Sequence, residues 1–255
     1  MKFNHFLYGA AYYYEYLPYE RLEKDIKMMK ASNINVVRIG ESTWSTYEPQ
    51  EGVFDFSKLD EVIDAMNAAD INVIVGTPTY AVPTWMAKKH PEVMLTDKSG
   101  KREYGSRQII DITNPTFLYF SERIIRKIMA RTADKPNVIG FQVDNETKHF
   151  DTSSKNIYIG FQKWLKDKFN NNLDKLNHAY GLDYWSNRIN AWEDFPPINS
   201  TINGSLGSAF EEYKRSLVNT FLGWQVSIVN EYKHDEQFVT NNFDMEWRKL
   251  SFGLN

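Results

Sequence analysis

The chain has 255 residues, a hydrophobic fraction of 42%, a charged fraction of 25% and a formal net charge of -3. This length allows one large or two small globular domains with a sizeable core. The balanced charge, without a basic block, argues against nucleic acid as a partner, and no window reaches the ~18 apolar residues that a membrane span requires.

The sequence contains no cysteine. Disulfides and thiolate metal sites are therefore excluded, and nothing points to an oxidising compartment. The N-terminal segment lacks the unbroken apolar core of a signal peptide, because Asn4 and His5 interrupt it. We therefore expect a cytoplasmic protein. Aromatic residues make up 15% of the chain, and besides filling a core, such rings are typical of grooves that bind sugars.

Short apolar segments alternate with segments of helical periodicity along the first half of the chain. This alternation predicts parallel βα units covered by helices. Ser57 is the expected N-cap of the second helix. The predicted strands are 6–13, 34–40, 71–78 and 137–143, and the predicted helices between them are 19–32, 56–70 and 117–132.

After the fourth strand the pattern changes to a helical excursion that begins with residues 157–169. A long helix at 210–232 and a fifth strand at 237–243 follow. Both a barrel and an open doubly wound sheet fit this order. The barrel is favoured because no glycine-rich nucleotide loop follows the first strand, and because polar residues follow the strands, whose ends converge in a barrel. These residues are Glu15, Glu41, Thr77, Asn145, Glu146, Asn241 and Asn242.

The predicted fold is therefore an α/β TIM (β/α)8-type barrel, of which about five of the eight βα units are present, with a helical insertion after strand four. Five strands alone would leave an open sheet edge, which is costly. We expect residues 1–255 to form the N-terminal, partial-barrel piece of a longer protein, and the remaining barrel strands and C-terminal domains to lie outside this chain.

Asn145 and Glu146 stand where the fourth apolar run ends. A partly desolvated glutamic acid at a barrel mouth can hold a proton at neutral pH, as a general acid must. The neighbouring amide can donate to and accept from a sugar hydroxyl. The competing interpretation, a surface carboxylate that caps the next helix, fits the spacing equally well.

Two arginines and a His/Asp pair are further candidate site residues. Arg38 lies inside an apolar run, so its charge predicts an acidic partner within the barrel mouth. Arg107 follows a Gly-Ser turn and could hold a carboxylate, although a surface ion pair is the commoner role of a lone arginine. His149 and Asp151 are close in sequence, but no further ligand completes a metal site.

Several ordered segments resemble glycoside hydrolase family 42, the bacterial β-galactosidases. They include "NVVRIGESTWSTYEPQEGVFDFSKLD", "TPTYAVPTWMAKKHPEV", "VIGFQVDNE", "LDKLNHAYGLDYWS" and "FVTNNF". The resemblance covers nearly the whole chain. It implies a retaining glycosidase that releases terminal non-reducing β-D-galactose from β-galactosides without a cofactor.

The resemblance also implies roles for individual residues. Glu146 corresponds to the general acid/base and Asn145 to its sugar-binding neighbour. Arg38 and Arg107 resemble the two arginines of the barrel mouth, and Trp185 resembles the aromatic wall of the galactose pocket. In a retaining mechanism a second carboxylate attacks the anomeric carbon while Glu146 protonates the glycosidic oxygen.

The chain departs from the family pattern in two ways. Many members place zinc-binding cysteines after the acid/base, and "TKHFDTSSKN" has none, so we predict no structural zinc. The family's nucleophile is a glutamate after strand seven, and only five strands are predicted here. Asp244, Glu246 and Glu41 are poor substitutes, because nothing in their surroundings favours them. We therefore expect little or no turnover from this chain alone.

The sequence does not exclude several other functions. They are a related retaining enzyme such as a β-glucosidase or β-mannanase, a non-catalytic galactose-binding fragment, and a remnant without a ligand. The family's frequent trimers predict a homotrimer for the whole protein.

Overall fold

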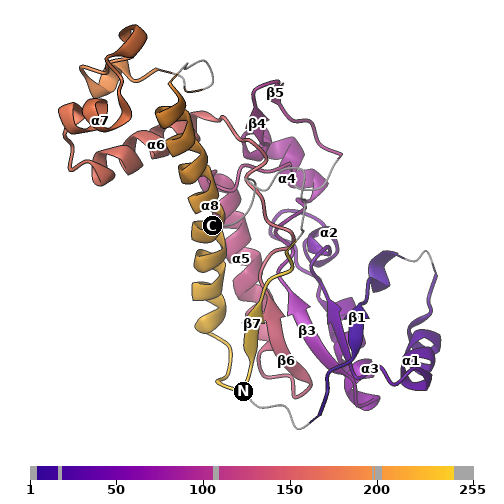
Figure 1. Cartoon of the computed structure of the whole chain (residues 1–255). Coiled ribbons are helices and arrows are strands. Elements are labelled where there is room, and N and C mark those ends of the chain that lie inside the picture. The colour runs from indigo at the N-terminus through magenta and orange to yellow at the C-terminus, as the bar shows by residue number, and fades with distance from the viewer. Residues whose placement is uncertain (1–4, 17–18, 106–108, 197, 199–202, 244–255) are drawn as a thin grey trace.

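A computed structural model describes residues 5–16, 19–105, 109–196, 198 and 203–243. One parallel sheet has the strand order β1-β2-β3-β6-β7 (Figure 1). All four neighbouring pairs are parallel, so the carboxyl ends of the strands meet at one edge. The five predicted strands are confirmed as β1 (Gly9–Ala11), β2 (Val36–Ile39), β3 (Asn72–Gly76), β6 (Val138–Gln142) and β7 (Phe238–Thr240).

Long helices cover the outer face of this sheet (Figure 1). They are α1 (Leu22–Ala31), α3 (Ser57–Ala68), α5 (Pro115–Thr132) and α8 (Gly204–Asn230). The apolar stripe of α3 is fully buried, as its helical spacing predicts. The predicted N-cap of α3 is wrong, because Phe56 holds that position and Ser57 is already helical. Asp55 takes over the capping, since its Oδ1 accepts from the backbone N–H of Ser57 at 2.9 Å.

Short elements fill the loops between the strands and the long helices. These are η1 (Tyr14–Tyr16), α2 (Trp44–Tyr47), α4 (Thr84–Lys89), η2 (Pro91–Val93) and an antiparallel hairpin of β4 (Thr96–Asp97) and β5 (Gly100–Lys101). Most are too short for periodicity to reveal them.

The predicted helical insertion after the fourth barrel strand is confirmed. It contains α6 (Lys155–Lys168), α7 (Leu173–Tyr180), η3 (Tyr184–Ser186) and η4 (Trp192–Asp194). The insertion has its own hydrophobic cluster, which includes the first part of α8. It therefore lies beyond one end of the sheet, next to the start of α8 (Figure 1).

The inner face of the sheet is open along the described residues. A cavity of about 340 Å³ runs along it, and β1 is exposed over its whole length. The helices among the described residues are each too short or too polar to span a membrane.

Candidate active site

The end of β2 carries a buried ion pair. Nε and Nη2 of Arg38 donate to the same oxygen of Glu41, Oε1, at 2.9 and 2.8 Å, and Glu41 is completely buried. Arg38 also donates to the Tyr13 hydroxyl at 3.3 Å. A Cβ on Gly76 would lie 2.8 Å from that of Glu41, so only glycine lets Glu41 pack this closely against β3. The acidic partner predicted for Arg38 is thus confirmed.

A second carboxyl group lies near Glu41. Burial raises the pKa of Glu15, the nearby charge of Glu41 raises it further, and a hydrogen bond from the Ser42 hydroxyl opposes both effects. Oε2 of Glu41 is buried and has no hydrogen-bond partner among the described residues. The carboxyl groups of Glu15 and Glu41 therefore lie close together at the ends of β1 and β2, and Arg38 is the counter-ion of Glu41.

Asn145 and Glu146 follow β6 at the same edge of the sheet. The Asn145 side chain is buried, and its Oδ1 accepts from Nδ2 of Asn242 at 2.9 Å and from Nε2 of Gln142 at 3.3 Å. The backbone N–H of Glu146 donates to the Asn242 carbonyl at 2.8 Å. The helix-cap interpretation of Glu146 is wrong, because Ser154 caps the next helix, α6. A fixed amide therefore stands beside a half-buried carboxyl group.

Asp144 is a site residue that the sequence prediction missed. Its carboxylate accepts from the Thr79 hydroxyl at 2.6 Å and from the Thr147 hydroxyl. Burial raises the pKa of Asp144 to about 6, although both hydroxyls and the backbone of Asn145 oppose the rise. The only sequence signal was its place between an apolar run and Asn145.

The raised pKa predicts a pH dependence of stability. The folded state disfavours ionised Asp144. The stability that the neutral Asp144 carboxyl group contributes is therefore fully present below about pH 3.8, and it is lost as the pH rises through about 6. A shift of about two units corresponds to roughly 3 kcal/mol. We expect Asp144→Asn, whose amide can still pair with both threonines, to remove this loss. Urea unfolding between pH 4.5 and 8 measures it, with exposed Asp64→Asn as the control. Parallel pH profiles of wild type and Asp144→Asn would contradict the assignment.

Of the other two predicted site residues, the structure describes only Trp185, and it does not bring Trp185 into this group. Arg107 lies outside the described residues. Trp185 lies on η3 in the insertion and is 69% exposed, and its ring packs edge-on against the Tyr184 ring, with 5.6 Å between the ring centroids. Its backbone has a φ of 53°, a strained value for such a residue. Among the described contacts, none joins Trp185 to the strand ends.

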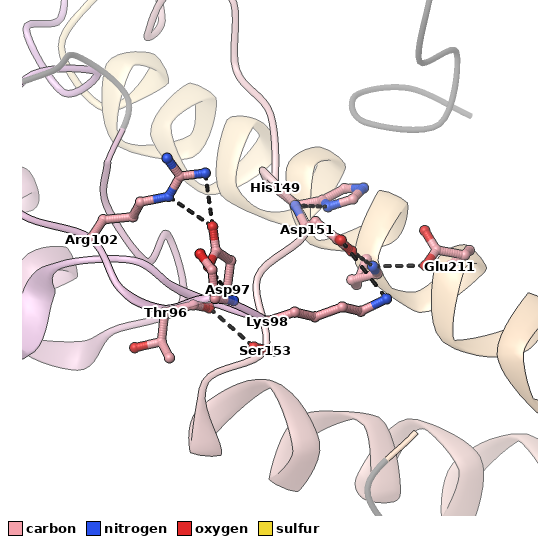
Figure 2. Close-up of polar contacts among 10 residues, drawn as sticks. Thr96, Asp97, Lys98, Arg102, His149, Asp151, Ser153 and Glu211 are labelled. Atoms are coloured by element: carbon pink, nitrogen blue, oxygen red, sulfur yellow. Dashed lines mark hydrogen bonds and ion pairs between the residues drawn. The ribbon is translucent and has the colours of Figure 1, made fainter. Parts of the chain in front are cut away.

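Two side chains after Glu146 that could bind a metal ion make contacts within the protein instead. Nδ1 of His149 accepts from the backbone N–H of Asp151 at 3.2 Å (Figure 2), and the Asp151 carboxylate lies 2.5 Å from Nζ of Lys214. Nδ1 of His149 and Oδ1 of Asp151 are thus already engaged. Within the described part of the chain, no three His, Cys, Asp or Glu side chains are placed to hold a metal ion.

Comparisons with known proteins find relatives over most of this chain. The chain is 33% identical over 242 residues to the beta-galactosidase BgaH of Haloferax lucentense, with coverage of 92% of this chain and 36% of that protein. It is 34% identical over 254 residues to the beta-galactosidase bgaB of Geobacillus kaustophilus, with coverage of 96% and 37%. The chain thus spans just over a third of the length of these relatives.

A solved structure extends the comparison to the fold. A catalytic mutant of Gan42B, a GH42 beta-galactosidase from G. stearothermophilus, superposes with a TM-score of 0.87 at 28% identity, over 94% of this chain and 36% of that one. This match confirms the predicted TIM-type barrel, of which the described sheet supplies five strands. The sequence model of glycoside hydrolase family 42, described as beta-galactosidase, matches residues 11–252, and the chain therefore belongs to this family.

Proposed function

We propose that this chain provides the proton-donating part of the active site of a retaining β-galactosidase. The observation that carries the proposal is the pair Asn145 and Glu146 at the carboxyl end of β6, within the sheet of a family 42 protein. Asn242 and Gln142 fix the Asn145 amide, and an amide at this position can donate to a sugar hydroxyl. Glu146 then lies beside the bound sugar.

In the proposed reaction Glu146 gives its proton to the glycosidic oxygen as the bond to the anomeric carbon breaks. A second carboxylate attacks that carbon and forms a glycosyl ester. Glu146, now ionised, takes a proton from water, whose oxygen attacks the anomeric carbon and releases the carboxylate. Two displacements leave the sugar with its original configuration.

Glu41 does not suit the role of the second carboxylate. It is completely buried, and Arg38 holds its Oε1 with two hydrogen bonds. We propose instead that this pair shapes the barrel mouth and that the nucleophile belongs to the part of the relatives' length that this chain does not span. The chain alone then has little or no turnover.

Arg107 and Trp185 stay predictions as sugar-binding residues. The exposed ring of Trp185 is available to stack on a ligand, but the described contacts do not bring it to Glu146. A homotrimer and a cytoplasmic location also stay predictions for the whole protein.

The test joins residues 1–255 to the remaining part of the Geobacillus kaustophilus relative, which gives a completed barrel. We expect hydrolysis of nitrophenyl β-galactoside with retention of configuration, seen by NMR of the first-formed sugar, and at least about 100-fold weaker kcat/KM for the β-glucoside and β-mannoside. Preference for either of those sugars would favour the related retaining enzymes. Galactose binding by calorimetry, without turnover in a folded hybrid, would favour a binding fragment.

A further inference from the structure

The loop that carries Glu146 has an unusual backbone. Between β6 and α6, Asp144, Glu146, Phe150 and Asp151 all have positive φ values, from 46 to 58°. Each such residue costs free energy and persists only where surrounding contacts hold it. Because Glu146 is one of the four, the groups that hold this loop also determine where its carboxyl group lies.

The start of the loop belongs to a closed ring of four hydrogen bonds. The backbone N–H of Asp144 donates to the Thr77 hydroxyl at 2.7 Å, and that hydroxyl donates to Oε1 of Gln225 at 2.6 Å. Nε2 of Gln225 donates to the Thr79 hydroxyl at 2.9 Å, which donates to Oδ1 of Asp144 at 2.6 Å. Each hydroxyl donates once and accepts once, so the ring has a single consistent direction.

Gln225 closes this ring from α8, outside the sheet. Its side chain is completely buried, and both halves of its amide are used within the ring. A buried amide without these partners would be costly. The ring thus ties α8 to the ends of β3 and β6, one residue before Asn145.

The end of the loop is tied to the same helix by an ion pair. Lys214 is 1% exposed and its Nζ lies 2.5 Å from Asp151 and 2.7 Å from Glu211. Burial alone would raise the pKa of Asp151, but Lys214 beside it holds the pKa below its ordinary value. Ser153 also donates from its backbone N–H to the Thr96 carbonyl at 2.7 Å (Figure 2).

Both anchors lie on one face of α8. Lys214 and Gln225 are eleven residues apart, close to three turns of 3.6 residues. Val218 and Phe221 lie between them and are also buried. The same face of α8 packs against α5 through the Phe117 and Phe221 rings, whose centres are 5.9 Å apart.

From these contacts we propose that α8 positions the proton donor, with Gln225 holding the start of the Glu146 loop and Lys214 holding its end. This role rests on the proposed function of Glu146. Neither side chain touches the substrate in this arrangement. They act by keeping a strained loop in the one conformation that presents Glu146 to the glycosidic oxygen.

The first test measures residue-resolved amide hydrogen exchange on the chain itself. In Gln225→Met, which keeps the side-chain size but removes the amide, we expect the Asp144 and Glu146 amides to exchange about tenfold faster or more, with Val75 in β3 unchanged. In Lys214→Met the Asp151 amide should exchange faster in the same way. Exposed Asn219→Ala on α8 is the matched control. Unchanged exchange at Asp144 and Glu146 in Gln225→Met would overturn the proposal.

The second test uses the completed barrel. A displacement of about 1 Å can cost roughly 100-fold in rate. We therefore expect Gln225→Met to lower kcat by about 10- to 100-fold while KM changes less than about twofold. If kcat stays at the wild-type value in a hybrid that Glu146→Gln inactivates, the positioning role is wrong. If Glu146→Gln stays active, the proposed function fails instead, and the exchange data still decide whether α8 holds the loop.

A conservative variant separates the hydrogen-bond ring from simple packing. Gln225→Glu has the same shape, and its neutral carboxyl group can accept from Thr77 and donate to Thr79. The ionised form cannot donate and places a charge beside Asp144. Relative to the intrinsic exchange rate at each pH, we expect the Asp144 amide of this variant to be as protected as in wild type at low pH and less protected than in wild type at high pH. Exchange in Gln225→Glu with the same pH dependence as wild type would contradict the ring.

Discussion

Replacing Glu146 by Gln in the completed barrel is expected to lower kcat for lactose by about 100- to 10,000-fold, the usual contribution of a general acid/base. The amide keeps the size of the side chain but cannot deliver a proton. A nitrophenyl galactoside should suffer less in the first displacement, because nitrophenolate leaves without protonation. Damage to the fold would slow both substrates equally. A larger decrease in rate for lactose than for the nitrophenyl galactoside therefore indicates that Glu146 donates the proton.

Added azide sharpens this result. In an acid/base variant the glycosyl ester still forms, and azide then attacks it without needing a base, which yields galactosyl azide of retained configuration. A variant lacking the nucleophile would give the inverted azide. Exposed Glu61→Gln is the matched control and should behave as wild type. Normal lactose turnover by Glu146→Gln, or an inverted product, would remove Glu146 from the role of proton donor.

Local pattern was sufficient to predict the frame of this site. The five strands are short apolar runs, and the stripe Leu59, Val62, Ile63 and Met66 on α3 is buried as its spacing predicts. Parallel strands bring their carboxyl ends together, so Arg38 and Glu146 could be assigned to one edge before any contact was known. Arg38 even required an acidic partner, and Glu41 is only three residues away.

The contacts that hold the site could not be predicted in this way. Thr77 and Gln225 bond to each other across 148 residues, and their meeting depends on strand register, on helix rotation and on the whole insertion between them. A single Gln within "FLGWQVSIV" shows only that a polar group lies among apolar ones. Which partners it meets is decided by tertiary packing, which periodicity does not encode.

Stability should depend most strongly on Glu48, a completely buried carboxylate between β2 and α3. Its Oε2 accepts from Nε1 of Trp44 at 3.0 Å, and its Oε1 accepts from the backbone N–H of Gly52 at 2.8 Å and from Arg123 on α5. All three partners are donors. Glu48→Gln would turn an NH₂ group toward one of them and leave Arg123 without its counter-ion.

We expect Glu48→Gln to lower the free energy of unfolding by about 3–5 kcal/mol, the usual loss when one partner of a buried pair is removed. Urea unfolding at pH 7 measures it. The matched control is Glu51→Gln nearby, whose exposed pair with Lys89 at 2.9 Å should contribute less than about 1 kcal/mol. Arg123→Met should also destabilise, and the double variant should lose less than the sum, because each single change leaves the other charge uncompensated. Equal effects of Glu48→Gln and Glu51→Gln would show that the buried carboxylate does not hold β2 against α5.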